Sequence, residues 1–176
     1  DAKEKMKNRK TPIASFYANL MAFDGYYEKK WFPYTMPISD IYGLRAAFNL
    51  IAGDKTLYER HARIGSATRA AVKEAGLKLH LQSGYSNTVT VFDIPECTDA
   101  KSILDEMRTK YNIMLAGSFD ELSGKVIRIG HMGENARLEH MVPALEALSA
   151  TLTDLGVTLQ GNLADLFLKH YREFQD

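Results

Sequence analysis

The chain has few of the features that define several common protein classes. It has a single cysteine, Cys97, so the sequence provides no pair for an internal disulfide, and this sparse usage is typical of a reducing compartment. No hydrophobic run approaches the roughly 20 residues that a membrane span requires. Acidic and basic side chains are equal in number, at 22 each, which leaves no excess positive charge for a nucleic-acid surface. We therefore expect a cytoplasmic protein with no membrane and no nucleic-acid partner.

Motifs for metal or nucleophilic chemistry are also missing. No two histidines stand at the i, i+4 spacing of a helical zinc site, so we expect no metal. The sequence has neither a nucleophile elbow nor a glycine-rich phosphate loop. Cys97 lies in the turn-like "IPECTD" without a neighbouring histidine or basic cluster to activate its thiol. These absences leave no catalytic residue that the sequence alone identifies.

The hydrophobic pattern instead predicts a mixed fold of helices and strands. Helical periodicity covers residues 37–53, 54–75, 98–111, 135–156 and 159–174, and strand-like patterns cover residues 77–82, 87–94, 113–118 and 125–132. From Asp54 onward the order is α-β-β-α-β-β-α. This order predicts an α+β fold, in which an antiparallel sheet of about four strands has helices packed on one face.

The same pattern divides the chain into three parts. Residues 1–36 are rich in lysine and aromatic residues but have little regular pattern, so we expect an arm that packs on a surface outside itself. Residues 37–157 carry the α+β pattern. Residues 158–176 are expected to form a C-terminal helical extension.

Two residues are candidates for binding. Arg128 interrupts the apolar strand "KVIRIGHM", and Gly130 on the same face leaves room beside a guanidinium whose planar fork suits a carboxylate. From the spacing alone, a solvated arginine on the outer face of the sheet, with or without an ion pair at the rim, is the favoured explanation. Thr35 precedes Pro37 at the start of a helix, where free backbone N–H groups can hold a phosphate. A purely capping threonine is the simpler alternative there.

Five segments, in this order, resemble the C-terminal part of the class V aminotransferases, a family that includes the alanine–glyoxylate and serine–pyruvate aminotransferases. They are "FPYTMPISDIYGLRAAFNLI", "RHARIGSATRAAVKEAGLKL", "SNTVTVFDIP", "DEMRTKYNIMLAG" and "GKVIRIGHMGENAR". The first segment begins at Phe32 and the last, which is the most specific, ends at Arg137, and the resemblance as a whole extends over roughly residues 32–157. The resemblance implies the small C-terminal domain of a fold type I enzyme, with pyridoxal 5'-phosphate as cofactor, small amino acids and 2-oxo acids as substrates, and a homodimeric assembly.

The resemblance also implies roles for single residues. Arg128 matches the arginine that binds the substrate α-carboxylate, and Thr35 matches a threonine that reaches the cofactor phosphate of the other subunit. Many relatives have a tyrosine where this chain has Phe32, which lacks a hydroxyl for the phosphate. The segment "AGSFDELSGK" departs from the family pattern "AGGQGELKGK" at residues 118–120, and we expect an altered substrate entrance there.

The largest departure from the family is a missing lysine. The lysine that holds the cofactor, the aspartate that pairs with its pyridine nitrogen and the large domain have no counterpart in these residues. Lys10, Lys29 and Lys30 lie in unrelated surroundings and are expected to be solvated. Transamination needs such a lysine, so we expect a C-terminal fragment or domain that is inactive alone and does not bind the cofactor by itself. The alternative is a stand-alone binding or assembly module that retains the fold without catalysis.

Overall fold

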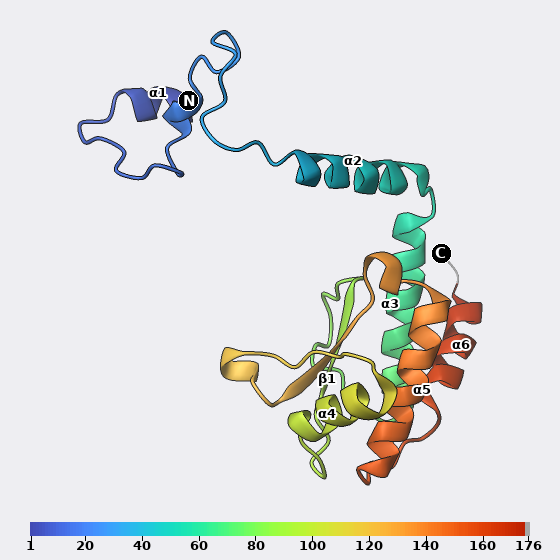
Figure 1. Ribbon diagram of the computed structural model, residues 1–176. Coiled ribbons are helices and arrows are strands. Elements are labelled where there is room, and N and C mark those ends of the chain that lie inside the picture. Colours follow the sequence, from blue (N-terminus) through green and yellow to red (C-terminus); the bar gives the residue numbers. More distant parts are fainter. Residues whose placement is uncertain (175–176) are drawn as a thin grey trace. The chain divides into compact units, whose positions relative to one another are not determined.

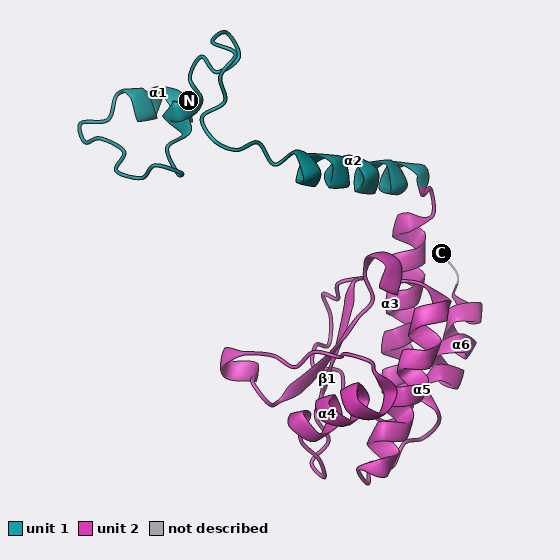
Figure 2. Ribbon diagram, viewed as in Figure 1, with its two compact units in different colours: residues 1–53 teal, residues 54–176 magenta. Residues whose placement is uncertain are grey.

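The computed structural model describes residues 1–174, and the chain divides into two compact units, Asp1–Gly53 and Asp54–Asp176 (Figure 2). The first unit contains the short helix α1 (Ala2–Lys7), the 3-10 helix η1 (Leu20–Phe23) and the helix α2 (Ile38–Gly53). The second unit contains α3 (Leu57–Glu74), β1 (Val89–Asp93), α4 (Ala100–Tyr111), the 3-10 helix η2 (Asp120–Leu122), β2 (Val126–Gly130), the 3-10 helix η3 (Gly133–Asn135), α5 (Leu138–Asp154) and α6 (Leu163–Glu173).

The arm in the first unit is held mainly by contacts between aromatic rings. The rings of Phe16 and Tyr34 lie 5.4 Å apart edge to face, and those of Phe23 and Phe32 lie 5.5 Å apart in the same manner. The Tyr34 hydroxyl donates a hydrogen bond of 2.6 Å to the carbonyl oxygen of Phe16. Edge-to-face pairs of this kind contribute roughly 0.5–1.5 kcal/mol each beyond the area that they bury. These contacts give residues 16–34 a local fold, although regular helix is short there.

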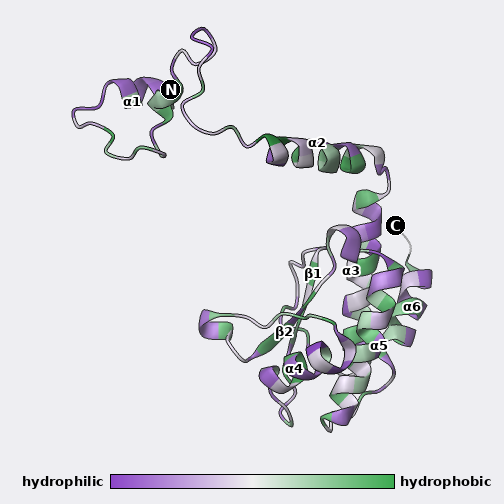
Figure 3. Ribbon diagram, viewed as in Figure 1, coloured by the Kyte–Doolittle hydropathy of each residue, from purple (hydrophilic) through white to green (hydrophobic). Residues whose placement is uncertain are grey.

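Helix α2 matches the helix predicted over residues 37–53, but it has no buried residue. Its large hydrophobic side chains, among them Ile41, Leu44 and Phe48, are about half to three-quarters exposed, and they recur along its whole length (Figure 3). A helix that is apolar on most sides is usually covered by other protein. The expectation that the N-terminal part of the chain packs on a surface outside itself stays a prediction.

The sheet of the second unit is antiparallel and contains two strands. In the register of β1 and β2, Val91 lies opposite Arg128 and Phe92 lies opposite Ile127. The two other strand-like segments run beside this pair but each forms only a single bridge, Leu79 with Phe92 and Ala116 with Arg128. The mixed fold with an antiparallel sheet is confirmed, whereas four strands are not confirmed. Period-two alternation reports which side chains face the core, and it does not fix how many ladder hydrogen bonds form.

One face of the sheet packs on the helices of the second unit (Figure 1). Thr90, Phe92, Ile127 and Ile129 point to this face and are at most 2% exposed. Helix α6 packs on both α3 and α5, so the C-terminal residues add to the core. The largest fully buried side chains are Phe92, Phe167, Ile64, Ile103, Met107, Ile127, Ile129, Met141, Leu145, Leu148, Leu152 and Leu163. Among residues 1–174, no helix combines the length and the hydrophobicity needed to cross a bilayer.

Candidate functional site

Strand β2 carries Arg128 on its outer face between two buried isoleucines. Ile127 and Ile129 are 0% and 2% exposed, whereas Arg128 is half-buried. The backbone N–H of Arg128 donates to the carbonyl oxygen of Ala116 at 2.7 Å, and its carbonyl oxygen accepts from the Ala116 N–H at 3.3 Å. With Val91 paired on the other side, the backbone at Arg128 is held from two directions. The strand therefore fixes where this side chain begins.

The guanidinium of Arg128 is only partly satisfied by protein groups. Its Nε donates a hydrogen bond of 2.5 Å to the carbonyl oxygen of Gly117. Within residues 1–174, no acidic side chain forms an ion pair with it, and its two terminal nitrogens have no hydrogen-bond partner. The terminal nitrogens together present the end of the planar fork, which can receive both oxygens of a carboxylate.

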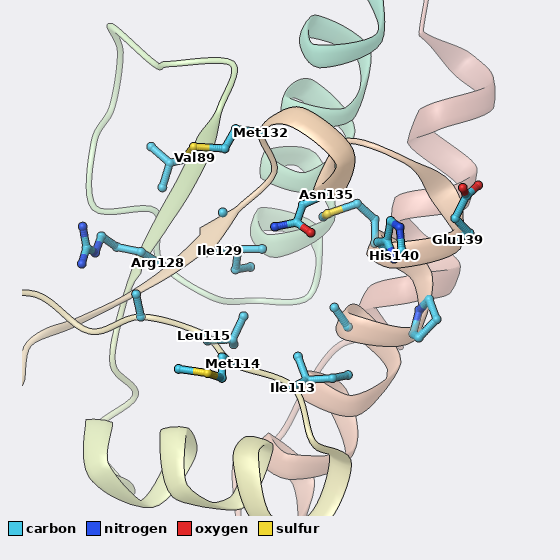
Figure 4. A pocket seen from close by; sticks show the side chains of 15 residues that line it. Val89, Ile113, Met114, Leu115, Arg128, Ile129, Met132, Asn135, Glu139 and His140 are labelled. Atoms are coloured by element: carbon cyan, nitrogen blue, oxygen red, sulfur yellow. The ribbon is translucent and has the colours of Figure 1, made fainter. Parts of the chain in front are cut away.

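A hollow of about 600 Å³ lies beside β2 (Figure 4). Its walls are largely apolar and include Ile113, Leu115 and Met132, with Asn135 and His140 at the side nearer to α5. Arg128 lies at one end of this hollow, and its guanidinium points away from the middle. A carboxylate bound by the terminal nitrogens would therefore lie at the outer end of the hollow, away from its middle.

The loop at residues 118–120 contributes an aromatic ring to the arginine. The guanidinium carbon of Arg128 lies 5.2 Å from the centroid of the Phe119 ring, within the range of a cation–π contact. Phe119 itself is 68% exposed, so the ring contacts the arginine at the surface without being part of the core. Asp120, which follows it, has a φ of 52°, in the left-handed region. The departure from the family pattern thus lies directly beside the candidate binding residue.

His131 is a buried polar residue to which the sequence analysis assigned no role. Its side chain is 0% exposed, its Nδ1 lies 3.1 Å from the carbonyl oxygen of Asn87, and its Nε2 lies 2.9 Å from the Thr90 hydroxyl. Because a carbonyl only accepts, Nδ1 carries the proton and Nε2 accepts from Thr90. Burial lowers the pKa of His131 from its ordinary value of 6.5 to about 4. The alternation of the strand places His131 on the buried face. A buried polar side chain requires hydrogen-bond partners, so this position could have been recognised from the sequence.

Thr35 lies in the first unit, three residues before α2 begins at Ile38. The sequence placed the helix start one residue earlier, at Pro37. The Thr35 side chain is exposed and forms no hydrogen bond with the described residues. The Ile38 N–H is already engaged with the carbonyl oxygen of Met36, and Asp40 adds a negative charge to the first turn. This segment offers one free hydroxyl and does not by itself form a cradle for a phosphate.

The lysines of the first unit do not complete a cofactor site either. Lys10, Lys29 and Lys30 are exposed, and the ammonium of Lys30 lies 4.2 Å from the centroid of the Tyr27 ring. Across the described residues, no group of three or more histidine, cysteine, aspartate or glutamate side chains is placed to hold a metal ion. Because these lysines are exposed to solvent, the residues present do not fit a complete pyridoxal phosphate site. What they provide is one arginine for a carboxylate and one separate hydroxyl.

Comparison with known proteins identifies relatives of this chain. No family model matches it. A serine–glyoxylate aminotransferase of Methylorubrum extorquens is 39% identical over 131 residues, which are 72% of this chain and 32% of the relative. A serine–glyoxylate aminotransferase of Arabidopsis thaliana is 36% identical over 149 residues, which are 80% of this chain and 37% of the relative.

Solved structures agree with these relatives over nearly the whole chain. The ureidoglycine–glyoxylate aminotransferase of Bacillus subtilis matches 97% of this chain and 45% of its own, with a TM-score of 0.86 and 30% identity. The pyridoxamine–pyruvate aminotransferase of Mesorhizobium loti matches 98% of this chain and 45% of its own, with a TM-score of 0.82 and 30% identity. This chain spans less than half the length of the relatives that it matches. It belongs to the class V family of pyridoxal-phosphate-dependent aminotransferases and corresponds to a C-terminal part of its members.

Proposed function

We propose that this chain is the small C-terminal domain, with its dimer-contact arm, of a cytoplasmic aminotransferase that acts on small amino acids and 2-oxo acids. The observation that carries the proposal is the Arg128 guanidinium, whose terminal nitrogens have no protein partner among the described residues and lie at the end of an open hollow. In this proposal residues 1–36 are the arm, residues 37–157 are the small domain, and residues 158–176 are its helical extension.

Arg128 binds and orients the substrate α-carboxylate. A bidentate arginine–carboxylate pair fixes both the position and the plane of the carboxylate, which brings the neighbouring carbon into a defined place for reaction. This role is one of positioning, because the arginine does not form or break a bond. The Gly117 carbonyl oxygen supports it by holding Nε, so that the two terminal nitrogens stay aligned toward the carboxylate.

Thr35 is proposed to contact the phosphate of pyridoxal 5'-phosphate in the other subunit of a homodimer. Its exposed hydroxyl, free of partners in the described chain, is consistent with a contact made outside its own unit. When bound, the cofactor supplies the electron sink for removal of the α-proton. The segments of this chain provide no lysine in a suitable place to move that proton, so the chain is inactive by itself.

The proposed substrate class rests on the size of the acids named for the relatives. Glyoxylate and pyruvate, the 2-oxo acids in those names, are small, and each combines a carboxylate with an adjacent carbonyl.

The test is to replace the matching C-terminal part of the Methylorubrum extorquens serine–glyoxylate aminotransferase with this chain and to measure transamination. We expect the hybrid protein to be active and Arg128→Lys to raise the KM for both substrates about tenfold to a hundredfold, since charge-assisted hydrogen bonds contribute roughly 1.5–3 kcal/mol. The matched control is Arg108→Lys, which changes an exposed arginine on α4 that pairs with Asp105. An unchanged KM in Arg128→Lys would contradict the assignment.

An assay of the isolated chain helps to distinguish this proposal from the alternative of a stand-alone binding module. Supplied with pyridoxal phosphate, serine and glyoxylate, the isolated chain should show no turnover. Turnover by the isolated chain would overturn the proposal. Pyruvate binding by the isolated chain, lost in Arg128→Ala, is compatible with both functions, whereas an inactive hybrid protein that still folds and binds pyruvate favours the module.

A further inference from the structure

Helix α2 has the composition of a buried helix, although its side chains are exposed (Figure 3). Asp40 and Arg45 are its two charged residues, and none of its 16 residues is buried. Helix α3, of similar length, carries its charged residues on one side and buries six residues on the other. An amphipathic helix such as α3 is complete when one side is covered, whereas a helix that is apolar on most sides is normally covered by more protein.

The large apolar side chains of α2 lie along one side of the helix. They recur at steps of three and four residues, which at about 100° per residue places them within an arc of roughly 80°. This apolar stripe consists of Ile41, Leu44, Phe48 and Ile51, which are between 49% and 71% exposed. Leu50 is 75% exposed and, by the same geometry, lies roughly 140° from the middle of the stripe. The helix therefore has one apolar docking face and a leucine that is outside it.

Neither cluster of apolar side chains in the described chain includes the apolar stripe. The arm pairs its aromatic rings with one another, and among residues 1–174 no ring pair includes Phe48. The core of the second unit is built from α3 to α6 and the sheet, and it contains no residue of α2. The stripe is thus a surface without a counterpart in either cluster.

The relatives indicate where a counterpart is found. The ureidoglycine–glyoxylate aminotransferase of Bacillus subtilis matches 97% of this chain, and the remaining 3% of 176 residues is about five, so the match includes most or all of the 16-residue helix. The match covers 45% of that relative, so more than half of its chain lies outside the matched part. The relative therefore combines the helix with a large additional part, and that part precedes the matched region because this chain corresponds to a C-terminal part.

We propose that the apolar stripe of α2 is the docking surface for the N-terminal part of the aminotransferase. Asp40 and Arg45 lie on the two sides of the stripe and leave its middle without charge, so the complementary surface is apolar. Helix α2 is then an interface element, and the compact small domain begins at Asp54, where the second unit begins, instead of at residue 37. This inference rests on the proposed function only in that the chain is the C-terminal domain, and not on the role of Arg128.

The experiment measures the accessibility of two positions of α2 in two proteins. The proteins are the 176-residue chain and its hybrid with the N-terminal part of the Methylorubrum extorquens serine–glyoxylate aminotransferase. Leu44→Cys places a thiol in the apolar stripe. Leu50→Cys is the matched control, because it replaces the same residue type on another side of the same helix at nearly equal exposure, 75% against 71%. Both are made with Cys97→Ser, since Cys97 is exposed, and labelling by N-ethylmaleimide is followed by peptide mass spectrometry.

In the isolated chain we expect both thiols to react at similar rates. In the hybrid protein, Leu44→Cys should react about tenfold more slowly or less, because a thiol covered by protein is not accessible to the reagent. Leu50→Cys should stay within about threefold of its rate in the isolated chain. An unchanged rate for Leu44→Cys in the folded hybrid overturns the proposal, and equal slowing at both positions overturns the assignment to the stripe.

Other occupants of the stripe give different results in the isolated chain. If a second copy of the chain covers it, Leu44→Cys reacts slowly there and becomes faster on dilution. If the second unit of the same chain covers it, Leu44→Cys reacts slowly at every concentration. Either result overturns the proposal.

A second measurement does not depend on the covalent link in the hybrid. The chain is co-expressed with the separate N-terminal part of the same relative, and the amount that co-purifies is measured. Leu44→Ser should reduce it about tenfold or more, and Leu50→Ser by less than about threefold, since only the first removes a leucine side chain from the contact. Equal retention of both variants overturns the proposal. If the stripe is protected but the folded hybrid has no transaminase activity, the docking surface is supported and the proposed function is overturned instead.

Discussion

The guanidinium of Arg128 lies over the exposed ring of Phe119, with 5.2 Å between the guanidinium carbon and the ring centroid. The Gly117 carbonyl oxygen holds the same guanidinium through Nε. Both partners come from the segment that carries the departure from the family pattern. That segment therefore restrains the arginine on two sides, while its terminal nitrogens have no partner among residues 1–174.

Phe119→Ala should weaken carboxylate binding without unfolding the chain. An exposed cation–π contact contributes roughly 0.5–1 kcal/mol, so we expect the Kd for pyruvate to rise about twofold to fivefold. Phe119→Tyr keeps the ring and should bind pyruvate as the unaltered chain does. Titration followed by NMR at the Arg128 side chain measures both. A larger loss in Phe119→Tyr than in Phe119→Ala would mean that the ring is not the relevant contact.

The sequence predicted the helices well because their signals are local. Helical periodicity identified α2 to α6, and the alternation around Ile127 and Ile129 placed Arg128 on the outer face. Helix starts were less accurate: the helix predicted over residues 98–111 starts at Thr98, whereas Asp99 caps α4 by accepting from the Ser102 N–H. Both residues are cap formers, and periodicity does not choose between neighbours.

The tertiary partners of the site had no local signal. The bond between His61 and Gly133 joins residues 72 positions apart, and neither residue type nor spacing indicates that pair. The free state of the Arg128 terminal nitrogens depends on which acidic side chains lie nearby in space, which the alternation of one strand does not contain. The resemblance to a family predicts a carboxylate as the ligand of Arg128. The structure places Arg128 at one end of a hollow.

Met107 and Met114 provide a matched pair for testing the core. Met107 is 0% exposed, and its sulfur accepts a hydrogen bond of 3.4 Å from the Thr151 hydroxyl, whereas Met114 is 83% exposed. Met107→Ala should lower the free energy of unfolding by about 2–5 kcal/mol, and Met114→Ala by less than about 0.5 kcal/mol. Urea unfolding followed by circular dichroism measures both. Equal losses in the two variants would contradict the assigned core.

Ser149 links two helices through one buried hydrogen bond. Its hydroxyl oxygen accepts from the Leu163 N–H at 2.8 Å, at the start of α6. Ser149→Ala leaves that buried N–H without its partner and should cost roughly 1–3 kcal/mol of unfolding free energy. Ser123→Ala, at an exposed position, is the control. If amide exchange at Leu163 becomes faster in Ser149→Ala but not in Ser123→Ala, the loss of unfolding free energy arises at this bond.

Because His131 is buried, the unfolding free energy of the chain should depend on pH between about 7.5 and 5, which is above the range where carboxylates titrate. Its folded-state pKa of about 4 lies below the unfolded value of 6.5, so the unfolded state binds more protons between these values. The stabilisation is complete above pH 6.5 and is lost as the pH falls toward 4. With 1.36 kcal/mol per pKa unit, we expect a loss of about 2 kcal/mol between pH 7.5 and pH 5.

His131→Gln removes this titration and should flatten the change in unfolding free energy between pH 7.5 and pH 5, even though the variant starts from lower stability. His140→Gln, an exposed histidine on α5, should retain the full dependence. Urea unfolding at the two pH values provides the comparison, and NMR titration of the ring protons reports the pKa of His131 directly. A ring that protonates near pH 6.5 in the folded chain would show that burial does not control this histidine.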